Sequence, residues 1–350
     1  MALDTVRIGI VGGGSIVRQR HMPGLRALEG IEFTVVCNRR RESAEAFAAE
    51  YGVGAVVDDW REVASHPDVD VVWIGTTPYL HARISVAALE SGKHVFCQAR
   101  MARNLAEARQ MVAAAERNPD RVVAICPPPM GMVGDATMRR LLRGERHVGT
   151  VRQVRLSVLA ASLAGASDEL HWRHDFDVSG FNTLTVGIYA EVSQRWVGPA
   201  ASLQARTDTY VRSRRDPASG EYVDVRVPDS VSVIGQLASG ADFVYQWSGV
   251  AHLGPATQLW VFGDGGTLVY DFETDTIRGA SLDAEELREI PIPEHERGGW
   301  QVETDFIRAV RDGGGTGLAP SFHTGLAYME FLEATMRSAR EGRRVALPLD

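Results

Sequence analysis

The sequence has few cysteines, no long hydrophobic run and no excess of basic residues. The three cysteines, Cys37, Cys97 and Cys126, each close an apolar run. An odd number without paired spacing argues against a disulfide framework or a zinc site and favours a reducing compartment. No apolar run approaches the roughly 18 residues of a membrane span, and the first predicted strand, from Thr5, leaves no room for a signal peptide. We therefore expect a cytoplasmic protein that holds no metal and enters no membrane.

The charge balance makes nucleic acid an unsuitable partner. The 350 residues include 37 basic and 45 acidic side chains, a formal net charge of -8. No stripe of basic residues alternates with aromatic ones, as a nucleic-acid surface would require. With 45% hydrophobic residues the chain is long enough for two domains with separate cores. A small molecule is the partner that we expect.

The first third of the chain alternates short apolar runs with amphipathic helical stretches. The runs predict strands within residues 5–11, 32–37, 54–57, 69–75, 93–97 and 121–126. Helical stretches lie between them, and Asn104 is a candidate N-cap with Glu107 at capping-box spacing. This alternation predicts a parallel sheet with helices on both faces, that is, an α/β Rossmann domain over residues 1–126.

The segment CPPPMGM, Cys126 to Met132, marks a change of pattern because three successive prolines continue neither a helix nor a central strand. Strands are then predicted within residues 148–160, 229–240, 241–250, 257–272 and 287–292, with a hairpin turn at Gly263–Gly266. Helices are predicted near 135–143 and over 183–196, 302–311 and 321–340. Residues 127–350 therefore read as a second, α+β domain with a mainly antiparallel sheet.

The segment GIVGGGSIV, residues 9–17, follows the first strand and opens a helix, which is the context of a dinucleotide-binding loop. Gly12 allows the tight turn, and Gly14 lets a pyrophosphate approach the backbone at the helix N-terminus, where Ser15 and Ile16 lie. Val17 stands where a third glycine or alanine is usual, and we expect it to loosen or shift the helix. A glycine turn that binds nothing is the alternative.

The end of the second strand favours NADP over NAD. NAD-binding versions place an acid there for the ribose hydroxyls, whereas this chain has Asn38 followed by Arg39, Arg40 and Arg41. Asn38 can bond a ribose, and Arg39 can face a 2′-phosphate or stack on adenine. A solvated basic loop is the alternative, and NAD stays possible.

Together, the GIVGGGSI loop, the block VVWIGTTPYLHARISVAALESGKHVFC and the β-rich second half resemble the Gfo/Idh/MocA family over the whole length. That family is named for glucose–fructose oxidoreductase, inositol dehydrogenase and a rhizopine-catabolism protein. The resemblance implies an open-faced sheet in the second domain, used for substrate binding and for assembly into a homodimer or homotetramer. It also implies a sugar, polyol or related cyclic substrate. The cofactor-binding positions implied are Gly12, Gly14, Ser15, Ile16, Asn38, Arg39, Thr76, Thr77, Pro78, His81 and Gln98.

Both catalytic motifs of the family are replaced. Its Glu-Lys-Pro turn after the fifth strand, in which the lysine contacts the reacting hydroxyl, aligns with Gln98, Ala99 and Arg100. Its Asp-x-Gly-x-His segment aligns with Thr185 to Tyr189. Hydride transfer to or from an alcohol also needs a proton donor or acceptor at the oxygen, and alanine, glutamine and arginine are poor ones. The family's usual mechanism cannot be carried over.

Other titratable groups cluster in ELHWRHDFDVSGFNTLTVGIYAEVSQRW. On a helix, Asn182, Thr185 and Tyr189 share a face. Tyr189 becomes a candidate acid/base if a nearby arginine lowers its pKa, and a buried packing tyrosine is the alternative. His171, which titrates near neutrality, is the second candidate, against an exposed loop histidine.

The remaining substrate candidates are polar residues of the same two regions. Arg173 could clamp a carboxylate or a hydroxyl pair with Trp172 as an apolar wall, or form a structural ion pair with Asp175 or Asp177. The predicted substrate-binding set is Gln98, Arg100, Trp172, Arg173, Asn182 and Thr185. We expect an NAD(P)-dependent oxidoreductase with non-standard acid/base residues. A lyase, hydratase or isomerase that retains its nicotinamide, and a non-catalytic ligand sensor, are the alternatives.

Overall fold

The computed structural model describes residues 4–126, 132–165, 169–314, 318 and 320–350. The chain divides into two compact units, the first made of residues 1–127 and 301–329 and the second of residues 128–300 and 330–350. The predicted CPPPMGM break falls at this division, and its residues 127–131 lie outside the described ones. Residues 301–329, which the sequence pattern placed with the second domain, belong to the first unit.

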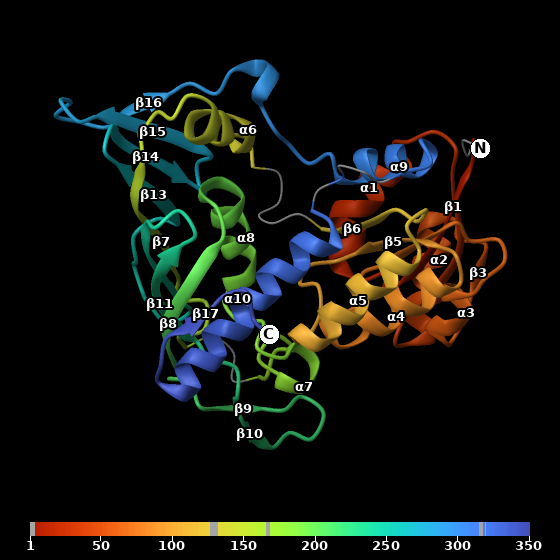
Figure 1. The fold of residues 1–350 in the computed structure, drawn as a ribbon. Coiled ribbons are helices and arrows are strands. Elements are labelled where there is room, and N and C mark those ends of the chain that lie inside the picture. The colour runs from red at the N-terminus through yellow and green to blue at the C-terminus, as the bar shows by residue number, and fades with distance from the viewer. Residues whose placement is uncertain (1–3, 127–131, 166–168, 315–317, 319) are drawn as a thin grey trace. The chain divides into compact units, whose positions relative to one another are not determined.

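The first unit is built on a six-stranded parallel sheet of order β3-β2-β1-β4-β5-β6 (Figure 1). Its strands are β1 Val6–Val11, β2 Ile31–Cys37, β3 Ala55–Val56, β4 Val71–Ile74, β5 His94–Cys97 and β6 Val123–Ile125. The central strands β4 and β5 are buried throughout, as expected of parallel strands covered on both faces. All six predicted strands and the Rossmann fold are confirmed.

Helices cover both faces of this sheet. They are η1 Val17–His21, α1 Met22–Arg26, α2 Arg41–Tyr51, α3 Trp60–Ala64, α4 Pro78–Glu90, α5 Leu105–Arg117, α9 Val302–Arg311 and the start of α10 Phe322–Glu341. Helix α9 lies beside α1 (Figure 1). Its Phe306 ring contacts the rings of Trp73 and Phe96, which stack on each other at 3.9 Å. This apolar contact with β4 and β5 explains why residues 301–329 belong to the first unit.

Asn104 caps α5 as predicted, with its side-chain oxygen accepting the Glu107 N–H at 2.9 Å. The Glu107 carboxylate does not complete a capping box on Asn104. It accepts the N–H of Arg103 and pairs with the Arg103 guanidinium instead. The Glu107 carboxylate therefore binds the charged Arg103 and not the N-cap backbone N–H that the capping-box spacing predicts.

Val17 packs closely on the sheet, so the expected loosening does not occur. Its side chain is fully buried, and a Cβ added at Gly75, after β4, would lie 2.2 Å from Val17 Cγ2. Gly75, after the strand, has no side chain and so leaves room for Val17. In other dinucleotide-binding loops this room comes from a glycine or alanine at the helix position of Val17. The helix does change shape at this point, because residues 17–21 form a π-helical turn.

We expect a pH-dependent loss of stability from His94, at the start of β5. Its Nδ1 accepts the Val122 N–H at 2.8 Å, and burial lowers its pKa to about 4. The unfolded chain then binds a proton first, so stability is constant above about pH 6.5 and falls as the pH drops toward 4. The expected loss from this one group at pH 5 is about 2 kcal/mol.

Urea unfolding of His94→Asn at pH 7.5 and pH 5 tests this. The asparagine oxygen can still accept the Val122 N–H but does not titrate, so the stability difference between the two pH values is expected to shrink by about 2 kcal/mol. His252→Asn, at an exposed position, is the matched control and leaves the difference unchanged. An unchanged difference in His94→Asn contradicts the assignment.

The second unit is built on a nine-stranded sheet of order β16-β15-β14-β13-β7-β12-β11-β8-β17, in which only the β7–β12 pair among the described strands is parallel. The mainly antiparallel sheet and the two-residue hairpin between β13 and β14 are confirmed. Its strands are β7 Val151–Leu159, β8 Ala200–Asp208, β11 Ser230–Leu237, β12 Asp242–Ser248, β13 Gln258–Gly263, β14 Gly266–Asp271, β15 Thr276–Ser281, β16 Arg288–Ile290 and β17 Val345–Ala346. A separate two-stranded sheet pairs β9 Ser213–Arg215 with β10 Tyr222–Asp224.

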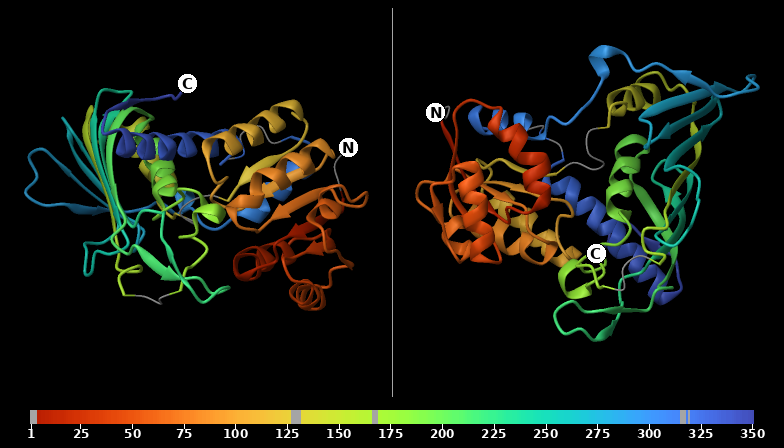
Figure 2. Two further views of the ribbon diagram at one scale, coloured as in Figure 1. Left: turned by 90° about the horizontal axis from the view of Figure 1, so that it is seen from below. Right: turned by 180° about the vertical axis from the view of Figure 1, so that it is seen from behind.

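Helices cover one face of the nine-stranded sheet (Figure 2). The helical segments of this unit are α6 Asp135–Arg139, η2 Arg140–Gly144, α7 Phe176–Ser179, α8 Val186–Val197, η3 Glu294–Glu296 and the remainder of α10. Helix α8 contacts the sheet through Trp196 against Tyr270, and α10 through Phe331 against Phe243 and Tyr245. These contacts form the core of the second unit.

The opposite face of this sheet carries exposed apolar side chains. Ile234 and Val244 oppose each other on β11 and β12 and are 55% and 40% exposed. Trp260 and Phe262 stack on this face of β13, whereas Trp247 is buried on the covered face. Within the described residues of the unit, no helix lies over this face (Figure 2).

No helix in the described ranges is both long and apolar enough to cross a membrane.

Candidate functional site

The glycine-rich loop has the shape that a dinucleotide requires. Gly12 has φ +89° and lies so close to the end of β4 that a Cβ there would be 2.7 Å from the Thr76 nitrogen. A Cβ at Gly14 would meet nothing within 4 Å, so its backbone faces open space. Ser15 and Ile16 open the helix, and N–H groups of a first helical turn lack intrahelical partners. The loop therefore fits a pyrophosphate.

Asn38 supports this loop from the end of β2. Its Oδ1 accepts the Gly13 N–H at 2.7 Å, and its Nδ2 donates to the Ser43 hydroxyl at 3.1 Å. The amide is thus engaged on both sides, and its observed contacts hold the loop in place. The ribose contact predicted for Asn38 has to coexist with these two bonds.

The arginines after Asn38 differ in their contacts. Arg41 pairs with Glu45 and Asp58, whereas Arg39 is exposed and forms no ion pair or hydrogen bond with other described residues. Acidic side chains lie near the end of β2 as well. Burial raises the pKa of Cys37 to about 11, and the negative charges of Asp59 and Asp58 add to this effect. Arg39 and the adjacent Arg40, which is likewise exposed, are the cations of this edge without an ion pair to another described residue.

The loop after β4 supplies the next predicted cofactor positions. Thr77 is the N-cap residue of α4 and Pro78 its first residue. The Oγ1 of Thr76 is buried and has no hydrogen-bond partner in the described structure, so it can accept or donate a bond to a ligand. His81 is fully buried between the carbonyl oxygens of Arg100 and Thr76, at 2.8 Å and 2.9 Å, and burial lowers its pKa. It ties the β4 loop to the turn after β5.

The turn after β5 contains the Gln98-Ala99-Arg100 motif. Gln98 and Arg100 are almost fully buried. The Gln98 amide contacts His21 Nε2 at 3.0 Å and the Ala99 N–H at 2.9 Å, and His21 contacts Glu303. The side chain of Gln98 is therefore engaged internally, and the substrate and cofactor contacts predicted for it have to coexist with these two bonds. His21 and Glu303 were not predicted, because they are 282 residues apart and neither belongs to a recognisable motif.

No lysine of this chain can replace the missing one. The sequence contains a single lysine, Lys93, and it precedes β5 at the edge of the sheet opposite Gln98. At about 3.3 Å per residue the two ends of this strand are roughly 16 Å apart. With Ala99 in the motif and Lys93 at the far end of β5, this chain has no lysine to contact the reacting hydroxyl as the family's lysine does.

In the second unit, His171, Trp172 and Arg173 lie together on one loop. The Arg173 guanidinium stacks over the Trp172 ring at 4.3 Å, and the His171 Nδ1 accepts the Arg173 N–H at 3.2 Å. Both His171 and Arg173 are exposed. Desolvation, and then the charge of Arg173, lowers the pKa of His171. Asp177 pairs with Arg226 and not with Arg173.

The predicted helical face of Asn182, Thr185 and Tyr189 does not form. Helix α8 begins at Val186, and Thr185 before it is left-handed with φ +65°. Asn182 is buried and donates to the Ser179 carbonyl at 2.7 Å, while the Thr185 hydroxyl donates to the Leu184 carbonyl. Both side chains satisfy local backbone groups, which is how short polar residues compete with helix formation.

Tyr189 lies in the first turn of α8, with its ring 5.0 Å from that of Phe272. Burial, and then the charge of Glu273, raises its pKa. The expectation that an arginine lowers the pKa of Tyr189 is therefore wrong. Tyr189 holds its proton at neutral pH, so it can act as a proton donor but is a poor base.

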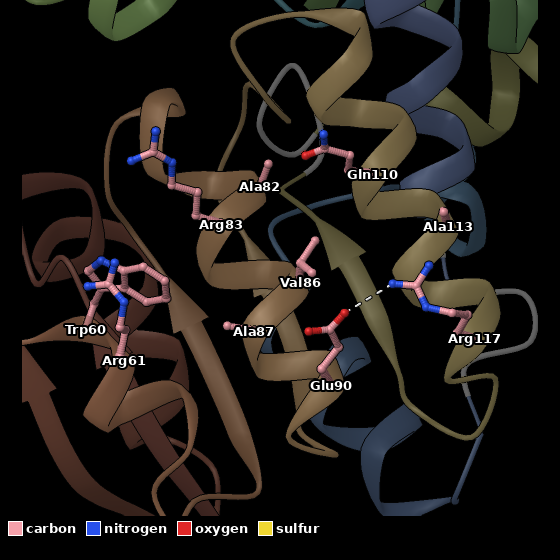
Figure 3. Close-up of a pocket in the computed structure, with 10 residues that line it drawn as sticks. All are labelled: Trp60, Arg61, Ala82, Arg83, Val86, Ala87, Glu90, Gln110, Ala113 and Arg117. Atoms are coloured by element: carbon pink, nitrogen blue, oxygen red, sulfur yellow. Dashed lines mark hydrogen bonds and ion pairs between the residues drawn. The ribbon is translucent and has the colours of Figure 1, made fainter.

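A groove of about 440 Å³ lies elsewhere on the first unit (Figure 3). Its lining comes from α3, α4 and α5, with Val86 and small alanines between arginines and an ion pair of Arg117 with Glu90. None of the predicted site residues lines it. It is a feature of the outer helical layer and not of the glycine-rich loop.

The fold and the loop define the chain as an oxidoreductase with an NAD-binding Rossmann domain. Residues 6–125 match the family model described as an oxidoreductase family with an NAD-binding Rossmann fold, and residues 136–269 match that of the GFO/IDH/MocA C-terminal domain. The chain belongs to the Gfo/Idh/MocA family of oxidoreductases. A nicotinamide dinucleotide is the cofactor type of this family's Rossmann domain.

Individual relatives resemble the chain at low identity. Levoglucosan dehydrogenase of Pseudarthrobacter phenanthrenivorans is 24% identical over 99% of both chains. The 1,5-anhydro-D-fructose reductase of Ensifer adhaerens is 38% identical over 109 residues, 31% of this chain and 32% of the reductase. Several curated relatives match in this way, over about a third of their length. A solved levoglucosan dehydrogenase, in complex with NADH and L-sorbose, has a TM-score of 0.83 at 22% identity and covers 98% of this chain and 99% of its own.

Proposed function

We propose that this protein is an NADP-dependent oxidoreductase that acts on a sugar, a polyol or a related cyclic metabolite without a catalytic lysine. The observation that carries the proposal is the loop of Gly12 to Gly14, shaped for a pyrophosphate, in a chain of oxidoreductase family membership. The similarity to levoglucosan dehydrogenase over nearly the whole length supports a carbohydrate substrate.

The preference for NADP rests on Arg39 and on the lack of an acid at the end of β2. A guanidinium binds a phosphate through two parallel hydrogen bonds, whereas an acid at this position would repel it. NAD remains the alternative, and the levoglucosan dehydrogenase structures contain NADH.

His171 and Tyr189 are the two alternative acid/base residues of this proposal, and one group serves both directions because the base of the oxidation is the acid of the reduction. A bound nicotinamide would supply the hydride chemistry. His171, whose pKa is lowered, is neutral at pH 7, so it can accept the hydroxyl proton in the oxidation and return it in the reduction. Tyr189, whose pKa is raised, keeps its proton and suits the reduction, in which it donates that proton to the carbonyl oxygen. Arg173 and Trp172 supply a cation and an apolar surface for the substrate.

Turnover by His171→Asn and Tyr189→Phe tests this assignment. The purified protein is assayed with NADP⁺ and levoglucosan or inositol, and with NADPH and 1,5-anhydro-D-fructose, by the absorbance of reduced nicotinamide. The loss of a general acid or base lowers kcat by roughly 10²-fold or more. The exposed positions His252 and Tyr210 provide the controls His252→Asn and Tyr210→Phe. Full turnover in both site variants contradicts the roles.

One observation favours a second candidate, a lyase, hydratase or isomerase with a retained nicotinamide. The only lysine of the chain lies at the wrong edge of the sheet, so net alcohol oxidation lacks its usual proton acceptor. Conversion of a sugar without a net change in reduced nicotinamide, together with a cofactor that co-purifies and does not exchange, would favour this candidate over the first.

We also propose that the uncovered face of the nine-stranded sheet pairs two or four copies of the chain. The exposed Ile234 and Val244 lie side by side on it, and the Trp260 and Phe262 stack lies on the same face beyond Arg155 of β7. Exposed apolar side chains on a sheet face that no described helix of the unit covers are typical of an interface. A molar mass in solution equal to one chain, measured by light scattering, contradicts this.

A further inference from the structure

A buried polar chain links three distant parts of the first unit. Glu303 of α9, His21 of η1 and Gln98 after β5 are 2%, 0% and 5% exposed. His21 Nδ1 lies 2.5 Å from Glu303 Oε1, and His21 Nε2 lies 3.0 Å from Gln98 Nε2. The Gln98 oxygen accepts the Ala99 N–H at 2.9 Å.

These contacts fix where each proton lies. A backbone N–H only donates, so the Gln98 atom that faces Ala99 has to be the oxygen. The NH₂ group of Gln98 then faces His21 Nε2 and donates to it, so this ring nitrogen carries no proton. The ring proton is therefore on Nδ1 and is donated to the Glu303 carboxylate. The contacts of His21 thus fit one tautomer, with Nδ1 as the donor to Glu303 and Nε2 as the acceptor from Gln98.

The hydrogen-bonded series Glu303–His21–Gln98 ends at the turn of residues 99–101, which has contacts with other buried side chains as well. The Arg100 carbonyl oxygen lies 2.8 Å from His81 Nδ1, and the Met101 N–H donates to the Tyr328 hydroxyl at 2.6 Å. The Ala99 N–H, bonded to Gln98, belongs to the Gln98–Ala99 peptide, whereas the Arg100 carbonyl and the Met101 N–H belong to one peptide, Arg100–Met101. The two peptide groups on either side of the Ala99–Arg100 bond are therefore each in contact with a buried side chain, and such support holds a site within the tolerance that chemistry requires.

We propose that Gln98 is a positioning residue. Glu303 and His21 orient its amide, and the amide fixes the peptide of Ala99, at the place where relatives carry the lysine. The functional part of this inference rests on the proposed oxidoreductase activity, because the turn is then the surface against which cofactor and substrate react. The proton arrangement does not rest on it.

A glutamine differs from a glutamate here in a specific way. In Gln98→Glu one carboxylate oxygen can still accept the Ala99 N–H, but the other has no proton to donate to His21. The hydrogen bond to His21 is then kept only if a proton is added, and with a carboxylate on each side of the ring we expect this proton on Nε2, which makes the imidazole an imidazolium. In Gln98→Met both hydrogen bonds are lost and the Ala99 N–H is left without its acceptor.

The first test is ¹⁵N NMR of the histidine rings in the full-length protein at pH 7, with His21→Asn used to assign the His21 signal. The expected result is a neutral ring protonated at Nδ1 in the natural protein and a doubly protonated ring in Gln98→Glu. A neutral ring protonated at Nε2 in the natural protein overturns the proposal. This readout needs no activity, so it decides the proton arrangement even if the proposed function fails.

The second test is steady-state turnover and NADPH titration of the same variants, with Gln110→Met at an exposed position of α5 as the matched control. Gln98→Met is expected to lower kcat at least tenfold, with the Kd for NADPH and the KM for the sugar within about threefold. Gln98→Glu is expected to recover kcat to within about threefold. A rise in Kd or KM with kcat unchanged identifies Gln98 as a ligand-binding residue and overturns the positioning role.

Discussion

Gly14→Ala is expected to weaken NADPH binding roughly 30-fold, about 2 kcal/mol, while the free energy of unfolding changes by no more than about 0.5 kcal/mol. The two effects separate because a Cβ at this position meets no protein atom and Gly14 does not have a positive φ. The methyl group would occupy the space through which a pyrophosphate approaches the backbone. Fluorescence titration with NADPH and urea unfolding measure the two quantities.

Two other glycines provide controls for this experiment. Gly12→Ala is expected to lose both cofactor binding and stability, because its Cβ would collide with backbone atoms next to Thr76 and the residue has a left-handed φ. Gly299→Ala, where the added Cβ also meets nothing, is expected to change neither. Unchanged NADPH affinity in Gly14→Ala would show that the loop does not hold a pyrophosphate.

Arg39→Ala is expected to weaken NADPH binding by about 10- to 100-fold and NADH binding by no more than about threefold. The guanidinium is exposed and unpaired among the described residues, and a charge-assisted bond to a phosphate contributes about 1.5–3 kcal/mol. NADH has no 2′-phosphate, so its affinity is the internal reference. Parallel titrations of the variant with both cofactors measure the ratio.

Arg40→Ala is the matched control for Arg39, since Arg40 is the adjacent residue and is also exposed. We expect it to change the ratio of the two affinities by less than about threefold. Because phosphate binding is electrostatic, the effect of Arg39→Ala on NADPH is also expected to shrink as the salt concentration rises. Equal losses of NADPH and NADH affinity in Arg39→Ala would remove the argument for NADP.

Local patterns were sufficient to predict most of the fold. Strand β4 is a continuous apolar run, and β5 is apolar after His94, because both faces of a parallel sheet are covered. The hairpin at Asp264 and Gly265 follows from its glycines. The pattern could not assign α9 to the first unit. That placement depends on contacts such as Phe306 against Trp73, between residues that are far apart in the sequence.

The candidate site was less predictable than the fold, because it also depends on local backbone geometry and on contacts between residues far apart in the sequence. A spacing argument assumed that Asn182 and Thr185 were helical, and the left-handed Thr185 breaks this assumption. The pKa of Tyr189 depends on Glu273 and on burial, which its neighbours in the sequence do not report. Gln98 was correctly located at the end of β5, but its partner His21 could be recognised only once the sheet and α9 brought the two together.

Whether this protein is an NADP-dependent oxidoreductase is decided by a fluorescence titration of the purified protein with NADPH and NADH, followed by addition of a sugar substrate to the complex. We predict that NADPH binds more tightly than NADH, exchanges freely and is oxidised when a keto-sugar such as 1,5-anhydro-D-fructose or L-sorbose is added. Binding of neither cofactor would contradict this function and favour a ligand sensor built on the same fold.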